Sequence, residues 1–184
     1  MRIIAGRWKG HRLAALGKGD TTAALRPTPD RVRESLFNML AHGSGTTPID
    51  GAVVLDLFAG TGALGLEALS RGAATATFVE NGRTALRLLR ENIERTGADA
   101  TIITRDATKL GDAPAPATLV FLDPPYGKGL GTKAILSAVA GGWIAEGATI
   151  VWEEAAAMRP PEGFTPLDAR VYGGTHVSVF AYAP

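Results

Sequence analysis

The stretch of residues 53–65, VVLDLFAGTGALG, constrains the fold of this chain more than any other feature. A short apolar run carries an acid, Asp56, turns through Gly60 and Gly62, and enters a helical pattern over residues 63–71. A strand, a glycine turn and a helix in this order form the ligand-binding unit of open α/β sheets. Glycines let the backbone approach a ligand closely, and the helix N-terminus offers unpaired N–H groups. The stretch therefore predicts an α/β protein with a ligand at the glycine turn.

The acid in this stretch helps to decide between two classes of ligand. The spacing Gly60-x-Gly62-x-x-Gly65 fits the dinucleotide fingerprint, and Glu80 follows at about the expected distance of 20 residues. Asp56, however, would lie close to a pyrophosphate and repel it. A cationic nucleoside such as S-adenosylmethionine, which has a sulfonium and no phosphate, would be attracted instead. An NAD-dependent oxidoreductase stays open as a distant alternative.

From residue 53 onward, predicted strands and helices alternate. We expect strands at 53–57, 75–79, 100–104, 119–122, 149–153 and 176–182, and helices at 63–71, 83–96 and 131–140. An earlier helix is expected to begin at Pro29 behind Thr28 as its N-cap. The order predicts a mostly parallel sheet, closed by an antiparallel C-terminal hairpin around Gly173 and Gly174.

Acidic residues follow the ends of four of these strands. They are Asp56, Glu80, Asp106 and Asp123. The carboxyl ends of parallel strands meet at one edge of an open sheet, and ligands bind at that edge. The four acids therefore predict a binding site there.

Five segments resemble known enzymes. Residues 56–62, DLFAGTG, resemble the first motif of S-adenosylmethionine-dependent methyltransferases, and residues 123–126, DPPY, resemble the fourth motif of their amino-methylating branch. The segments RIIAG at 2–6, RPT at 26–28 and DRVRESLFN at 30–38 resemble the 16S ribosomal RNA guanine-N2 methyltransferase family. The resemblance covers nearly the whole chain and departs at Gly174, where the family usually has Asp. It implies a Rossmann-like seven-stranded methyltransferase sheet with an N-terminal basic β-hairpin.

The same resemblance implies a site for S-adenosylmethionine, which would leave as S-adenosylhomocysteine. The expected cofactor-binding residues are Asp56, Phe58, Gly60, Gly62, Glu80, Asn81, Asp106 and Ala107. Glu80 suits both ribose hydroxyls because a carboxylate accepts two hydrogen bonds at once. Asp106 is expected to accept from the adenine amino group, with Ala107 beside it. For Asn81 we favour a second role, as the cap of helix 83–96.

The tetrapeptide at 123–126 is expected to carry the chemistry. An exocyclic amine on a base is a poor nucleophile because its lone pair is delocalised into the ring. Asp123 and the carbonyl of Pro124 can accept its two hydrogens and free the lone pair, and Tyr126 can stack on the extruded base. Guanine N2, adenine N6 of DNA or RNA, and a protein glutamine amide all offer such an amine. Other amino methyltransferases therefore stay open as alternatives.

Positive charge gathers at the start of the chain. Residues 1–40 carry a net charge of +5, and the remainder carries −4. We expect residues 1–25 to form a basic RNA-binding hairpin and linker, and residues 26–184 to form the methyltransferase domain. The expected RNA-binding residues are Arg2, Arg7, Trp8, Lys9, Arg12 and Arg26. The alternatives are a solvated basic face with Trp8 folded back onto the domain, or a non-catalytic RNA-binding module.

Composition excludes several other classes of protein. The chain has no cysteine, which excludes disulfides, thiolate zinc sites and a thiolate nucleophile of the kind that C5 methylation of pyrimidines needs. No metal centre is expected. No apolar run is long enough for a membrane span, and no signal peptide is apparent. We therefore expect a cytoplasmic protein without a membrane partner. The family resemblance implies that it acts on 16S rRNA, within an assembling or assembled small ribosomal subunit, and we expect it to be a monomer.

Overall fold

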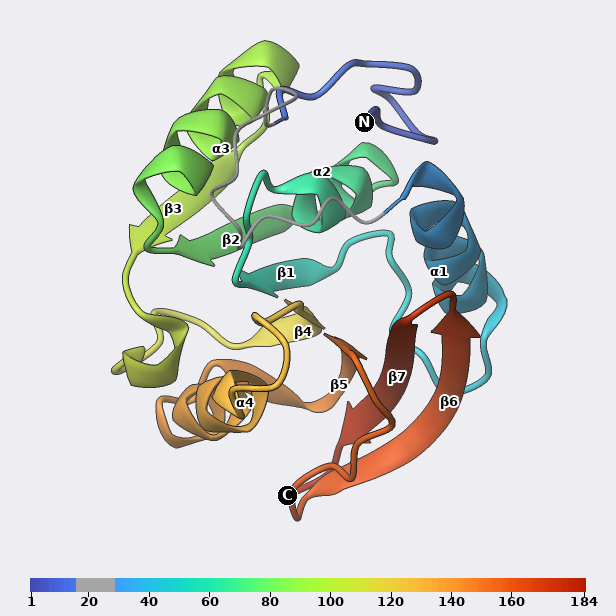
Figure 1. Ribbon diagram of the computed structural model, residues 1–184, viewed down its shortest axis with the longest axis vertical. Helices are drawn as coiled ribbons and strands as arrows, with labels where there is room; N and C mark the ends of the chain where they lie inside the picture. Colours follow the sequence, from blue (N-terminus) through green and yellow to red (C-terminus); the bar gives the residue numbers. More distant parts are fainter. Residues whose placement is uncertain (16–28) are drawn as a thin grey trace.

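The computed structural model describes residues 1–15 and 29–184. Four helices and seven strands alternate along this part of the chain (Figure 1). In chain order they are α1 (Asp30–His42), β1 (Val53–Leu57), α2 (Ala63–Ser70), β2 (Thr75–Glu80), α3 (Arg83–Thr96), β3 (Ala100–Thr104), the short 3-10 turn η1 (Ala107–Lys109), β4 (Ala117–Leu122), α4 (Leu130–Ala140), β5 (Ile144–Glu154), β6 (Phe164–Tyr172) and β7 (Thr175–Tyr182).

All seven strands form one sheet in the order β3-β2-β1-β4-β5-β7-β6. The first five strands in this order are parallel, and β7 pairs antiparallel with both β5 and β6. This arrangement confirms the predicted α/β class, the mostly parallel sheet and the antiparallel C-terminal hairpin. The direction of winding reverses between β1 and β4, and open sheets bind ligands outside the strand ends at such a switch point.

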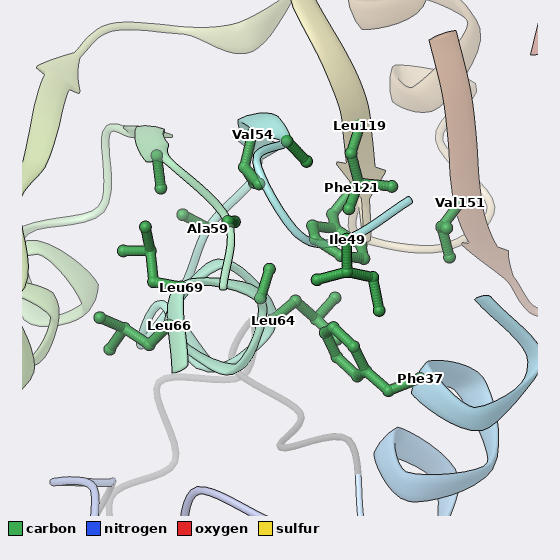
Figure 2. Packing of buried hydrophobic residues seen from close by; sticks show 14 of the residues in the cluster. Phe37, Ile49, Val54, Ala59, Leu64, Leu66, Leu69, Leu119, Phe121 and Val151 are labelled. Atoms are coloured by element: carbon green, nitrogen blue, oxygen red, sulfur yellow. The ribbon is translucent and has the colours of Figure 1, made fainter. Parts of the chain in front are cut away.

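Alternate strand residues pack against different helices on the two faces of the sheet. Val54 and Phe121 face α1, α2 and α3, whereas Leu55 and Val120 face α4 and η1. Figure 2 shows the core between the sheet and the helices α1 and α2, where Phe37 of α1 lies near Phe121. The centroids of these two rings are 5.7 Å apart. Within the described residues, no helix combines the length and apolar character needed to cross a bilayer.

Several boundaries differ from the prediction. Strand β5 begins at Ile144 instead of residue 149, and the edge strand β6 begins at Phe164, although only its end before the Gly173 turn was expected to be extended. The register shifts between Pro166 and Asp168, as a bulge on an edge strand permits, because a proline there need not donate to the ladder. The N-cap of α1 is Pro29, one residue later than predicted, and the expected cap Thr28 lies outside the described residues.

Residues 1–15, called here the N-terminal segment, contain no regular strand, so the expected β-hairpin is not shown. They form one antiparallel bridge, between Arg2 and Arg12, and the Ile3 N–H donates to the His11 carbonyl at 2.9 Å. The side chains of Ile3 and Leu13 are buried in the same core as α1, α2 and α3. The backbone N–H groups of Ile4 and Ala5 donate to the buried carboxylate of Glu67 on α2, at 2.7 and 3.0 Å. The described part of the segment is thus packed against the sheet-covering helices (Figure 1).

Candidate active site

The turn between β1 and α2, residues 58–62, is called here the glycine loop. Phe58 has a φ of 61°, the one positive φ among the described residues that are not glycine. Gly60 and Gly62 follow with φ of 56° and 79°. Left-handed backbone costs energy at a bulky residue and persists where its surroundings enforce it, which is common at functional sites. A Cβ on Gly62 would lie 2.5 Å from the Leu89 side chain, so the loop admits no side chain there.

Glu80 ends β2 and fixes this loop from the side of the neighbouring strand. Its Oε2 accepts from the Gly60 N–H at 2.8 Å, and its Oε1 accepts from the N–H groups of Asn81 at 2.9 Å and Gly82 at 2.7 Å. The predicted capping role of Asn81 is wrong. Gly82 is the N-cap of α3 without a side-chain cap bond, and Asn81 is exposed. The Glu80 carboxylate already bonds the two N–H groups that lead into the helix.

Asp56 lies beneath the glycine loop and is only 2% exposed. Its Oδ2 accepts from the Gly65 N–H at 3.1 Å and so ties β1 to the first turn of α2. Burial raises the pKa of Asp56 well above its usual range, with smaller contributions from the charges of Asp123 and Glu80. Asp56 thus lies close enough to both Asp123 and Glu80 for their charges to act on it, as the alignment of strand ends predicted. A Cβ on Gly65 would lie 2.4 Å from the Phe78 ring, which explains the third glycine of the motif.

Asp106 and Ala107 stand after β3, further along the same edge. The Asp106 side chain is exposed, and its Oδ1 accepts from the N–H of Thr108 at 2.9 Å and from its hydroxyl at 2.8 Å. These two bonds lower the pKa of Asp106, so it is a carboxylate at neutral pH. Ala107 begins η1 and is buried in the core layer that α4 covers.

The DPPY segment follows β4 at the switch point. Asp123 is partly exposed and Pro124 is buried. Burial of its carboxyl group raises the pKa of Asp123 to about 7, and the charge of Glu154 adds to the effect. The hydroxyl of Tyr126 lies 3.4 Å from Thr175 Oγ1, at the start of β7. Burial also raises the pKa of Tyr126.

Sequence reasoning missed the contribution of β5 and β7 to this part of the site. Glu153 and Glu154 end β5, next to β4, and pair with Val177 and His176 of β7. Glu153 is 2% exposed, an unusual position for a carboxylate. Two acids directly after the apolar run 149–152 were the signal for these residues.

The expected RNA-binding residues of the N-terminal segment lie elsewhere. The N–H of Arg7 donates to the Ser70 carbonyl at 2.8 Å, the N–H of Trp8 donates to Ser70 Oγ at 3.0 Å, and the Arg7 guanidinium stacks 4.2 Å above the Trp8 ring. Ser70 ends α2, whereas the glycine loop precedes it, and an eight-residue helix separates the two by about 12 Å.

Of the remaining residues of that set, Arg2, Lys9 and Arg12 are exposed, and Arg2 lies 3.6 Å from Asp30. Arg26 lies outside the described residues. The structure therefore brings the acids of the strand ends together, and it places Arg7 and Trp8 at the other end of α2.

The chain is similar in sequence and in fold to known proteins. The sequence model of a family described as conserved hypothetical protein 95 matches residues 1–181. The chain is 42% identical over 155 residues to ribosomal RNA small subunit methyltransferase D of Escherichia coli (strain K12), which covers 83% of this chain and 74% of that protein. It is 35% identical over 182 residues to the protein of the same name from Haemophilus influenzae, which covers 94% of this chain and 89% of the relative. The solved structure of the Escherichia coli protein yhhF superposes with a TM-score of 0.83 at 36% identity, over 100% of this chain and 98% of that one.

Proposed function

The chain belongs to the family described as conserved hypothetical protein 95, and on this basis we propose that it methylates the exocyclic N2 amine of a guanine in small-subunit ribosomal RNA. The observation that carries the proposal is the place of Asp123. Its partly buried carboxyl follows β4 at the switch point, next to the strand that leads into the glycine loop. A relative that is 42% identical over most of this chain carries the name of a small-subunit ribosomal RNA methyltransferase.

S-adenosylmethionine fits the residues at this edge, and when bound it supplies an electrophilic methyl group. The glycine loop gives it an approach without side chains, because Gly60 and Gly62 have backbone conformations that favour glycine. Glu80 and Asp106 offer carboxylate oxygens toward the ribose and adenine positions that we expect. The acids at the strand ends suit a cationic ligand and disfavour the phosphates of a dinucleotide.

Asp123 and Pro124 prepare the target amine. As a carboxylate, Asp123 accepts one N–H of the amine, and the Pro124 carbonyl accepts the other. The two adjacent prolines restrict the φ angles that set the direction of this carbonyl. With both hydrogens held, the nitrogen lone pair is directed at the methyl carbon, and most of the rate gain comes from positioning and electrostatics. The surplus proton of the methylated amine is lost to Asp123 or to water.

The basic N-terminal segment supplies the contact with RNA phosphates in this proposal. Arg7, Lys9 and Arg12 are exposed. Replacing all three by glutamine should reduce the slope of log affinity against log salt by about two, since each phosphate contact on single-stranded RNA contributes roughly 0.7. An unchanged slope would remove the segment from the RNA interface. That the protein is a cytoplasmic monomer remains a prediction from the sequence.

Transfer of labelled methyl groups tests the function directly. Purified protein, labelled S-adenosylmethionine and small-subunit RNA, either free or in assembled subunits, should yield N2-methylguanosine after digestion of the RNA. Asp123→Asn serves as the matched control, because it keeps the shape of the side chain but removes the anionic acceptor, and it should lose nearly all activity. Recovery of N6-methyladenosine, or of labelled protein, would contradict the substrate proposed here.

A further inference from the structure

Asn92 on α3 joins two parts of the molecule that are distant in sequence. It is fully buried. Its Oδ1 accepts from the Ala14 N–H at 2.6 Å, and its Nδ2 donates to the Ala14 carbonyl at 3.1 Å and to the Thr61 carbonyl at 2.9 Å. Thr61 lies between the two glycines of the glycine loop. One side-chain amide thus holds the N-terminal segment on one side and the proposed cofactor loop on the other.

The chemistry of this amide makes the connection stiff. Both Nδ2 hydrogens are used, one on each carbonyl, so neither bond can be replaced from the same side chain. In a buried position, separating the partners would leave polar groups without hydrogen bonds, which costs far more than an ordinary bond contributes. A shift of Ala14 is therefore expected to carry Asn92 and Thr61 with it.

Two side chains form hydrogen bonds with the backbone of the glycine loop, one with an N–H group and the other with a carbonyl. Glu80 accepts the Gly60 N–H, whereas Asn92 donates to the Thr61 carbonyl. Glu80 belongs to the proposed cofactor site itself. Asn92 reaches the same loop from the side of the N-terminal segment, which carries the proposed RNA contacts.

We propose that Asn92 is a positioning residue that sets the glycine loop for the cofactor and couples it to the seating of the N-terminal segment on RNA. The coupling rests on the function proposed above. The positioning role rests on the contacts of Ala14, Asn92 and Thr61.

Two substitutions at Asn92 and one matched control separate positioning from mere stability. Asn92→Ala removes all three bonds, and Asn92→Asp keeps an acceptor for Ala14 but places oxygen against the Thr61 carbonyl. Ser70→Ala is the control, since Ser70 Oγ also holds the segment, by accepting from Trp8 and donating to the Ala5 carbonyl, but it does not touch the glycine loop. All three should lower the melting temperature.

Calorimetry with S-adenosylmethionine gives the first readout. Both Asn92 variants should bind it roughly three- to tenfold more weakly than the wild type, the size expected for a lost hydrogen bond, and Ser70→Ala should bind within about twofold. A residue that only stabilised the fold would leave the affinity of the folded protein unchanged. Equal affinity in Asn92→Asp and Ser70→Ala would overturn the positioning role.

Hydrogen exchange without any ligand gives a readout independent of the proposed function. In Asn92→Asp, the amides of Gly60, Gly62 and Ala14 should exchange about tenfold faster together, whereas Ser70→Ala should speed exchange only near Trp8. Unchanged exchange in the glycine loop would overturn the proposal even if the protein bound no S-adenosylmethionine. Failure of wild-type binding with the expected exchange would instead refute the proposed cofactor and leave Asn92 in its role.

The coupling is tested by calorimetry with S-adenosylhomocysteine, which has no methyl group to transfer, in the absence and presence of saturating small-subunit RNA. By linkage, RNA should change the affinity of the wild type and of Ser70→Ala for S-adenosylhomocysteine by a similar factor. That factor should fall to about one in Asn92→Asp. Absence of the factor in the wild type would overturn the coupling.

Discussion

Replacing Asp123 by asparagine should make the protein more stable at neutral and alkaline pH while it removes methyl transfer. The carboxyl is held where its charge is poorly solvated and where Glu154 repels it, so its pKa rises from 3.8 to about 7. Asparagine has nearly the same shape and no charge. The substitution therefore removes a charge that destabilises the fold but that methyl transfer requires.

The size and the pH dependence follow from the shifted pKa. A rise from 3.8 to about 7 corresponds to about 4 kcal/mol between the two protonation states. The expected gain in the free energy of unfolding is smaller, about 2 kcal/mol. Asp123 is partly in contact with solvent, and the new amide needs hydrogen-bond partners of its own. Between these two pKa values the folded state holds more protons than the unfolded state, so the stability of the wild type falls as pH rises through this range. The advantage of Asp123→Asn should be small near pH 4 and complete above pH 7.

Urea unfolding at a series of pH values measures this difference. Asp112→Asn, on an exposed loop, is the matched control and should leave stability unchanged within about 0.5 kcal/mol at every pH. A constant difference between Asp123→Asn and the wild type from pH 4 to pH 8 would refute the argument. It would mean that the Asp123 carboxylate is well solvated in the folded protein.

Three further substitutions, one of them with a matched glycine control, test other parts of the structure. Glu154→Gln removes a charge that raises the pKa of Asp123. The acidic limb of the pH profile of kcat/KM should therefore move to lower pH, with about twofold higher activity than the wild type at pH 6. An unmoved limb would contradict the assignment of this limb to Asp123. Gly65→Ala should lower the free energy of unfolding by about 1–3 kcal/mol, because its Cβ meets an aromatic ring, whereas Gly174→Ala, with nothing within 4 Å, should leave it unchanged in the same denaturation assay. Ile3→Ala should cost about 2–4 kcal/mol in chemical denaturation, because Ile3 is fully buried in the main core; no loss would favour a separable N-terminal arm.

The sheet and the acids at its edge could be predicted because each depends on local sequence. The run from Val53 to Leu57 and the glycines after it specify a strand, a turn and a helix within a few residues of one another. Parallel strands then bring their carboxyl ends to one edge, so Asp56, Glu80 and Asp123 converge as expected. Gly97 likewise ends α3 in a left-handed conformation, with a φ of 61°.

The positions of side chains between elements could not be predicted in the same way. Neither Glu67 nor Asn92 belongs to a recognisable motif, and each bonds a backbone group at least 62 residues away. Trp8 and Arg7 form a basic and aromatic pair in the sequence, which suggests a free tip, but Ser70 holds both of their N–H groups. Such contacts depend on which surfaces meet after the sheet has formed, and local patterns contain no record of them.

The separation of charge along α2 constrains how RNA can approach. Glu80, Asp123 and Glu154 lie at the strand ends, and an RNA backbone laid along this edge would place phosphates against carboxylates. The exposed Arg7 lies at the far end of α2, beside Ser70, where the RNA backbone meets no such repulsion. A single base turned out of its stack can span the distance without bringing its neighbours' phosphates to the acids. The same acids that favour a cationic cofactor thus admit an uncharged base and repel the RNA backbone to which the base is attached. This suits an enzyme that acts on one exposed nucleotide at a time.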